Sequence, residues 1–135
     1  MARRIVVHSF AQARAALAAA AALGMDVTLA SAPAAGGYAG PGWFKALIDD
    51  ARRAVPNARC DTVLNCGAAP GMAFAAMRLG FKRIRLAGNA EAVRRLAAIG
   101  AAIESGEEPV LDLRGLRRPE ARCRAWLAGG AVTRP

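Results

Sequence analysis

Apolar and polar positions along the chain follow two alternating periods, which predicts strands separated by helices. Short, continuous apolar runs such as Ile5, Val6 and Val7 are typical of parallel strands that are buried on both faces. Longer stretches with helical spacing follow most of these runs, and glycine or proline separates the elements. The predicted strands are residues 3–8, 25–31, 62–66, 83–87 and 101–104, and residues 110–113 form either an edge strand or extended coil.

Helices are expected at residues 10–23, 43–55, 70–79 and 90–99, with a last one beginning at Pro119. Ser9 and Gln12 form a capping-box pair before the first helix, and Gly24 stands where a glycine ends it. Residues 31–42 are rich in glycine, alanine and proline and exceed the usual length of about two to six residues for such connections. We therefore expect a loop there, acting as a lid or an interface arm.

The alternation of strands and helices indicates the α/β class with right-handed crossovers. A chain of 135 residues fits one hydrophobic core. We predict a single α/β domain over residues 1–135, with a loose tail after about residue 129. Its architecture is expected to be a three-layer sandwich around a mostly parallel sheet of four to five strands, flavodoxin-like or Rossmann-like.

Composition narrows the range of partners and compartments. No apolar run reaches the roughly eighteen residues that span a bilayer, and no export signal is visible, so we expect a soluble, cytoplasmic protein without a membrane partner. The cysteines, Cys60, Cys66 and Cys123, are interpreted as free, mostly buried thiols.

The formal net charge is +9, and 17 of the 19 basic residues are arginine. This excess either marks a partner that carries phosphate or acidic groups or reflects a general compositional bias. Clustering is visible only in one segment near the carboxyl end, which holds Arg114, Arg117, Arg118, Arg122 and Arg124.

Small and polar residues follow several predicted strands. Because the carboxyl ends of parallel strands meet at one edge of a sheet, where α/β proteins usually hold ligands, we expect these residues to gather there. The predicted ligand-binding residues are Ser9, Ser31, Tyr38, Asn65, Gly67, Ala68, Gly71 and Asn89.

Two residues of the same edge are potentially reactive. Cys66 precedes a predicted helix, whose dipole favours a thiolate, and His8 at the end of another strand could act as its base. The alternative is that Cys66 is a small packing residue. No metal site is predicted, because a single histidine and isolated cysteines lack any recognised ligand spacing.

The segment Cys-Gly-Ala-Ala-Pro-Gly, residues 66–71, resembles the glycine-rich turn of class I S-adenosylmethionine-dependent methyltransferases, especially the RNA ribose methyltransferases. The resemblance covers about a dozen residues and implies a cofactor site at this turn. Asn65 and Asn89 stand where that family carries acidic residues. The alternative is a helix start that uses small residues for close packing.

Three further segments together resemble small uncharacterised α/β proteins of proteobacteria: Ile-Val-Val-His-Ser-Phe, Gly-Pro-Gly-Trp-Phe and Cys-Gly-Ala-Ala-Pro-Gly-Met-Ala. This resemblance implies no activity. Trp43 and Phe44, which end the second of these segments, are interpreted as core residues in preference to ligand-stacking ones.

The leading hypothesis is that a small anionic or carbonyl-containing ligand binds at the carboxyl edge of the sheet. Residues 67–71 would supply backbone donors, and residues 38–43 would cover the ligand. The alternatives are a thiol-dependent enzyme using Cys66 with His8, a nucleic-acid-binding or methyltransferase-like domain, and a structural subunit of a homo-oligomer. The sequence leaves open whether any reaction is catalysed and which cofactor, if any, is used.

Overall fold

The computed structural model of the chain describes residues 2–104, 106 and 108–129, and it confirms the α/β class with a parallel sheet. The described strands lie in the order β5-β4-β3-β2-β1-β6, so the sheet has six strands where four to five were predicted. The additional strand is β6 (Val110–Asp112), which pairs with β1 (Arg3–Val6). The sequence left this segment open between an edge strand and extended coil.

The strand order differs from those of Rossmann-like and flavodoxin-like sheets. In both of those folds the order reverses early in the chain, whereas β1 to β5 follow one another without a reversal here. The predicted three-layer arrangement stays a prediction. The predicted loose tail after residue 129 lies outside the described residues.

The chain forms two compact units, which we describe one at a time. Unit 1 comprises Met1–Ala30, Leu47–Asp61 and Glu108–Pro135, and unit 2 comprises Ser31–Ala46 and Thr62–Glu107. Two elements, β3 (Arg59–Asn65) and α3 (Pro41–Ala54), contribute residues to both units. The prediction of a single domain stays a prediction.

In unit 1, β1 lies between β6 and β2 (Asp26–Ala30), and both pairings are parallel. Helix α1 (Phe10–Leu23) has the predicted limits, because its ends are set by local signals. The Ser9 hydroxyl accepts a hydrogen bond from the backbone N–H of Gln12, and Gly24 ends the helix with a φ of 64°. The other half of the predicted capping box was wrong, because Gln12 Oε1 accepts from the N–H of His8 and not from that of Ser9.

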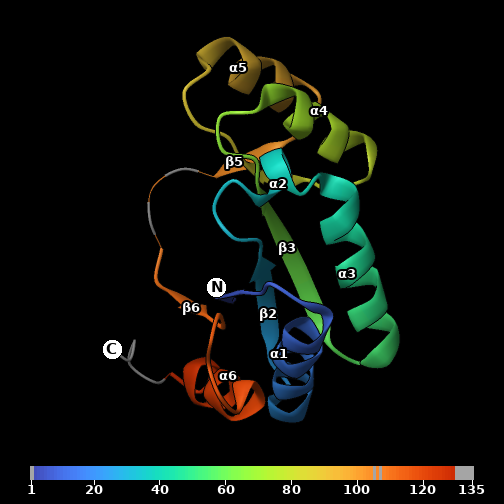
Figure 1. Cartoon of the computed structure of the whole chain (residues 1–135), viewed down its shortest axis with the longest axis vertical. Coiled ribbons are helices and arrows are strands. Elements are labelled where there is room, and N and C mark those ends of the chain that lie inside the picture. Colours follow the sequence, from blue (N-terminus) through green and yellow to red (C-terminus); the bar gives the residue numbers. More distant parts are fainter. Residues whose placement is uncertain (1, 105, 107, 130–135) are drawn as a thin grey trace. The chain divides into compact units, whose positions relative to one another are not determined.

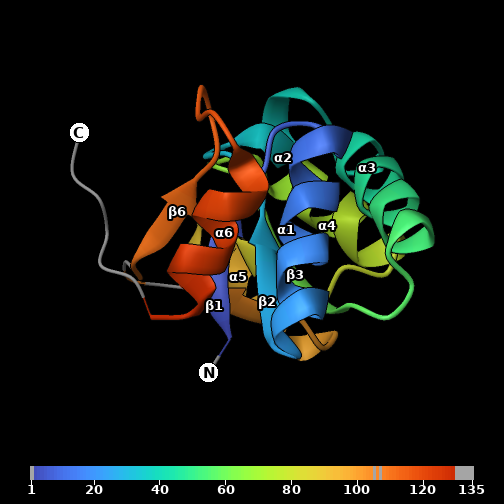
Figure 2. The same ribbon diagram turned by 90° about the horizontal axis from the view of Figure 1, so that it is seen from below.

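Helix α6 (Pro119–Leu127) lies beside α1 in both views of the chain (Figures 1 and 2). Buried alanines of α1, including Ala13 and Ala16, leave room for a close helix neighbour. Trp126 of α6 is also bonded to β1, because its indole Nε1 donates to the carbonyl oxygen of Arg4 at 3.1 Å. The Arg3 guanidinium lies 4.2 Å from the centroid of the Trp126 ring, within the range of a cation–π interaction.

In unit 2, the end of β3 pairs with β4 (Arg83–Arg85), and β4 pairs with β5 (Ala102–Glu104), again in parallel. Helices α4 (Pro70–Arg78) and α5 (Ala90–Ala98) contact each other (Figure 1). The Phe44 ring is buried and stacks on Phe81 with centroids 5.9 Å apart, as expected for a core residue. Trp43, however, is 39% exposed, so its assignment to the core was wrong.

The predicted loop over residues 31–42 contains a short helix, α2 (Ala35–Tyr38), and α3 begins within it at Pro41. The prediction of a loop without helical structure was therefore wrong. Two glycines of α2 lie against the chain that follows β3: a Cβ added to Gly36 would lie 2.9 Å from Cys66 Sγ, and one added to Gly37 would lie 3.2 Å from the Cys66 carbonyl oxygen. The absence of side chains at these positions lets the two backbones approach closely.

None of the helices in the described part of the chain combines the length and the apolar character needed to cross a membrane.

The contact between α2 and the end of β3 can be tested with two glycine variants. Gly36→Ala should destabilise the protein by about 1–3 kcal/mol, because the new methyl group meets backbone and buried atoms of residues 64–66. Gly42→Ala is the matched control: it lies in α3 with no atom near its added Cβ, so it should be neutral or stabilising by up to about 1 kcal/mol. Urea unfolding measures both. Equal midpoints for Gly36→Ala and the wild type would contradict the packing described.

Candidate functional site

The Asn65 side chain organises the carboxyl end of β3 in unit 2. Its Oδ1 accepts hydrogen bonds from the backbone N–H groups of Ala34, at 3.0 Å, and Gly67, at 2.9 Å. Two backbone donors can meet only the oxygen of a carboxamide, so the orientation of the amide is determined by its neighbours. The Nδ2 group, with two donor hydrogens, has no partner among the described residues, and it is not enclosed.

Ser31 and Gly67 hold the same region. The Ser31 hydroxyl accepts from the backbone N–H of Asn65 at 2.9 Å and lies 3.3 Å from the Ala32 carbonyl oxygen, to which it donates. Gly67 has a φ of 57°, in the left-handed region, and a Cβ at this position would lie 2.9 Å from that of Ala34. Both facts explain why glycine occupies the first position of the turn.

Backbone pairing with β4 continues past the end of β3. The Cys66 N–H donates to the Arg85 carbonyl oxygen at 2.8 Å, and the Gly67 carbonyl oxygen accepts from Ala87 at 2.7 Å. The N–H groups of Ala68 and Gly71, by contrast, donate to no described residue. Together with Asn65 Nδ2, they leave three hydrogen-bond donors without a protein acceptor near the start of α4.

Cys66 is fully buried, and Gly36 lies directly against its sulfur. Burial raises the pKa of the Cys66 thiol to about 11. The expected effect of the helix dipole, which would favour the thiolate, is therefore outweighed by desolvation. This result weighs against Cys66 as a nucleophile.

His8 lies in unit 1, just beyond β1, and its ring contacts Asp112 at the end of β6. The distance from His8 Nε2 to Asp112 Oδ1 is 2.6 Å. Burial by itself would raise the pKa of Asp112, but the backbone N–H of Arg114 and the interaction with His8 outweigh it and lower the pKa. Sequence reasoning missed Asp112. The sequence does show a carboxylate at the end of an apolar run. That carboxylate reaches His8 only because the run forms a strand that pairs in parallel with β1.

Several other predicted ligand-binding residues have structural roles. The Ser9 hydroxyl caps α1, and Asn89 Oδ1 caps α5 by accepting from the Ala92 N–H at 2.9 Å. Tyr38 ends α2, but its side chain lies outside what the structure describes. The residues of the predicted edge are divided between the units: His8 and Ser9 belong to unit 1 and the others to unit 2. The pairing of Cys66 with His8 stays a prediction.

The resemblance to methyltransferases implies a cofactor site at this turn, so we compared the hydrogen bonds of Asn65 and Asn89 with the acidic residues of that family. Asn65 and Asn89 replace the two acidic residues, and their Oδ1 atoms already accept from backbone N–H groups. The Asn65 oxygen has both lone pairs engaged, whereas the Asn89 oxygen accepts one hydrogen bond and keeps a second lone pair. Neither asparagine supplies the carboxylate that this family carries at these positions, and the resemblance stays a prediction.

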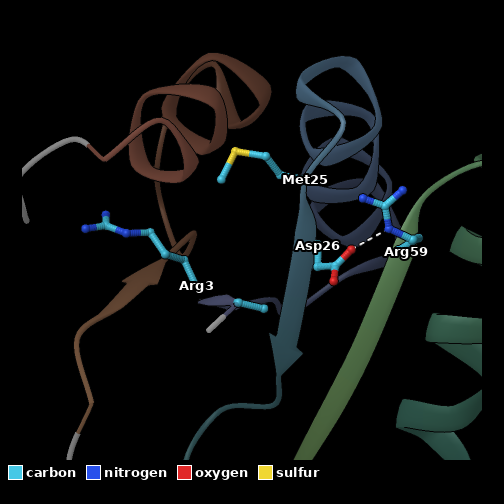
Figure 3. A pocket seen from close by; sticks show the side chains of 5 residues that line it. Arg3, Met25, Asp26 and Arg59 are labelled. Atoms are coloured by element: carbon cyan, nitrogen blue, oxygen red, sulfur yellow. Dashed lines mark hydrogen bonds and ion pairs between the residues drawn. The ribbon is translucent and has the colours of Figure 1, made fainter.

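A surface hollow of about 360 Å³ lies in unit 1, near the amino ends of β1 and β2 (Figure 3). Asp26 and Arg59 form an ion pair at its edge, and the Arg59 guanidinium also donates to the Gly24 carbonyl oxygen. The Arg3 guanidinium is occupied with Trp126. Because the hollow lies at the amino edge of the strands and its charged groups are paired, we assign it no function.

Comparison with known proteins found no family model that matches the chain and no similar curated protein.

Thiol reactivity should follow burial. Burial raises the pKa of Cys66 to about 11 and that of Cys123 to about 12, a value to which Glu120 also contributes. Burial raises the pKa of Cys60 as well, but Arg52 opposes the shift and the residue is only half-buried. At about pH 8 we expect iodoacetamide to modify Cys60 at least roughly tenfold faster than the other two cysteines in the native protein, and all three at similar rates in urea. Mass spectrometry of the alkylated peptides gives the rates. Fast native alkylation of Cys66 would instead revive its proposed role as a nucleophile.

The lowered pKa of Asp112 predicts a pH-dependent contribution to stability. A carboxyl group whose folded-state pKa lies below its usual value, here 3.8, stabilises the fold above that value, and the stabilisation is lost as the pH falls through the folded-state pKa. Asp112→Asn should therefore be less stable than the wild type near pH 6. The difference should be at most about 1 kcal/mol, because the side chain is half-exposed.

Urea unfolding at about pH 6 and about pH 3 tests this expectation, since the two proteins should converge in acid. A difference that grows on acidification would contradict it.

Proposed function

We propose that the protein binds a small anionic or carbonyl-containing ligand at the start of α4 in unit 2. The observation that carries this proposal is the set of three unpaired donors, namely the N–H groups of Ala68 and Gly71 and the Nδ2 group of Asn65. Polar groups of a folded protein are usually paired with protein atoms or water, so a cluster of donors without acceptors suits a ligand rich in acceptors.

Electrostatics favour an anion at this position. The amino end of a helix carries a partial positive charge, and Pro70 at the first position of α4 contributes no N–H of its own. A carboxylate at position 65 would repel an anion, but asparagine is neutral and offers two donor hydrogens. Phosphate, carboxylate and polarised carbonyl groups are the ligands that match such a site.

The turn is held in place before any ligand arrives. Asn65 Oδ1 ties Ala34 to Gly67, and the continued pairing with β4 holds residues 66 and 67. A rigid turn lowers the entropic cost of ordering donors around a ligand. The proposal is independent of whether helices cover both faces of the sheet, as in the predicted three-layer sandwich.

The substitution Asn65→Asp tests the role of the amide group. It keeps an oxygen that can accept from Ala34 and Gly67, but it removes both donor hydrogens and adds a negative charge. A thermal-shift panel of nucleotides, sugar phosphates and keto acids should raise the melting temperature of the wild type with at least one compound. A ligand at about 100 times its dissociation constant stabilises by about 2.7 kcal/mol.

That compound should not raise the melting temperature of Asn65→Asp. The matched control is Asn57→Asp, which adds the same charge at an exposed turn of unit 1 and should bind normally. In amide NMR spectra of the wild type, the signals of Ala68 and Gly71 should move on titration. A flat panel, or binding that leaves those two signals unchanged, would refute the proposed site.

A further inference from the structure

The ring of His8 in unit 1 is held at one nitrogen and open at the other. Nε2 is bonded to Asp112, whereas Nδ1 has no hydrogen-bond partner among the described residues and is not enclosed. The His8 side chain is 19% exposed, so most of the ring is packed while one polar atom reaches solvent. A carboxylate that orients one ring nitrogen and leaves the other free is the arrangement of a general base.

Backbone and side-chain bonds hold the chain that follows β6 close to His8. The Leu113 N–H donates to the Val6 carbonyl oxygen at 3.1 Å, and the Leu113 carbonyl oxygen accepts from Gln12 Nε2, also at 3.1 Å. Gln12 Oε1 in turn accepts from the His8 backbone N–H at 2.8 Å. A turn closed by the bond from the Leu116 N–H to the Leu113 carbonyl oxygen then leads into the arginine-rich segment.

Three arginines of this segment are exposed: Arg114, Arg117 and Arg118. The guanidinium groups of Arg117 and Arg118 form no ion pair with any described residue. The other two carboxylates of residues 108–129 are already engaged, Glu108 with Arg4 and Glu120 with Arg124.

The segment that follows Asp112 therefore carries more positive than negative charge. Arg118 also has a φ of 54°, a strained value for a residue other than glycine, and such strain is more frequent at functional positions.

We propose that His8 and Asp112 form a proton-transfer site for a phosphate-bearing ligand, which Arg114, Arg117 and Arg118 bind. In the step that the geometry allows, a hydroxyl of the ligand gives its proton to His8 Nδ1: the O–H bond breaks with its electron pair kept by the ligand oxygen, and the lone pair of Nδ1 forms the new N–H bond. The proton on Nε2 stays in the bond to Asp112, whose carboxylate stabilises the imidazolium. His8 is the catalytic residue, and Asp112 is a positioning residue.

Phosphate is the favoured anion because guanidinium groups bind phosphate oxygens through paired hydrogen bonds. A small phosphorylated metabolite and a single-stranded polynucleotide present the same group, so the experiment includes both. This site lies in unit 1, and the inference does not rest on the ligand proposed for unit 2.

His8 is the only histidine of the chain, which makes its ring nitrogens direct reporters in ¹⁵N NMR spectra. In the neutral ring we expect the proton on Nε2, and in Asp112→Asn we expect a mixture of tautomers. The probes are ribose 5-phosphate, inorganic phosphate and a short single-stranded oligoribonucleotide, added separately to the full chain. At least one of them should move the Nδ1 signal of the wild type, and the same probe should move it less in Asp112→Asn.

The double variant Arg117→Gln/Arg118→Gln should weaken binding of that probe roughly tenfold or more. The control Arg78→Gln/Arg94→Gln removes the same charge from exposed positions of unit 2 and should change it less than about twofold. A response to ribose 5-phosphate identifies a small ligand, a response to the oligoribonucleotide alone identifies a polynucleotide, and a response to inorganic phosphate shows that the bare anion is sufficient. Each of these outcomes supports the site.

Two results would overturn the proposal. One is an unchanged Nδ1 signal with all three probes. The other is an equal loss of binding in both double variants, which would show that only overall charge matters. Both double variants keep His8 and Asp112. If their unfolding midpoints equal that of the wild type, a loss of binding is not caused by a loss of folding.

Discussion

Parallel pairing of the strands is the constraint on which both units depend. A parallel strand cannot return through a tight turn, so each pair needs a crossover, and all strand ends of one kind face the same way within a unit. This direction brings His8 to Asp112 in unit 1, because β1 and β6 end together. It also brings the end of β3 beside that of β4 in unit 2, where the turn before α4 is held.

The two candidate sites handle unpaired polar groups in different ways. In unit 2 the side-chain oxygen of Asn65 accepts two hydrogen bonds from backbone N–H groups, and its Nδ2 donors have no partner among the described residues. In unit 1 the carboxylate of Asp112 is used to hold a ring, and a lone pair on His8 remains. Both arrangements satisfy one end of a polar group within the protein and leave the other end without a partner among the described residues.

Burial, and not the helix dipole, decides the chemistry of Cys66. A dipole contributes about 0.3–1 kcal/mol at a helix end, whereas desolvation of a buried thiolate can cost several times as much. Burial raises the pKa of the thiol to about 11. Helix α2 contributes to this burial, because Gly36 brings its backbone against the sulfur. An element that the sequence did not predict thus adds to the burial that disfavours the Cys66 thiolate.

The sequence by itself determined the features that depend on neighbouring residues. Ser9, Gln12 and Gly24 set both ends of α1, and the alternation of apolar runs with helical segments set the α/β class. Only the tertiary structure decided the strand order, the pairing of β6 with β1, the contact of Gly36 with Cys66 and the partnership of His8 with Asp112. These features join residues far apart in the chain, such as His8 and Asp112, which are 104 positions apart. Such pairings are selected by burial and by hydrogen bonds that form only when the whole chain has folded.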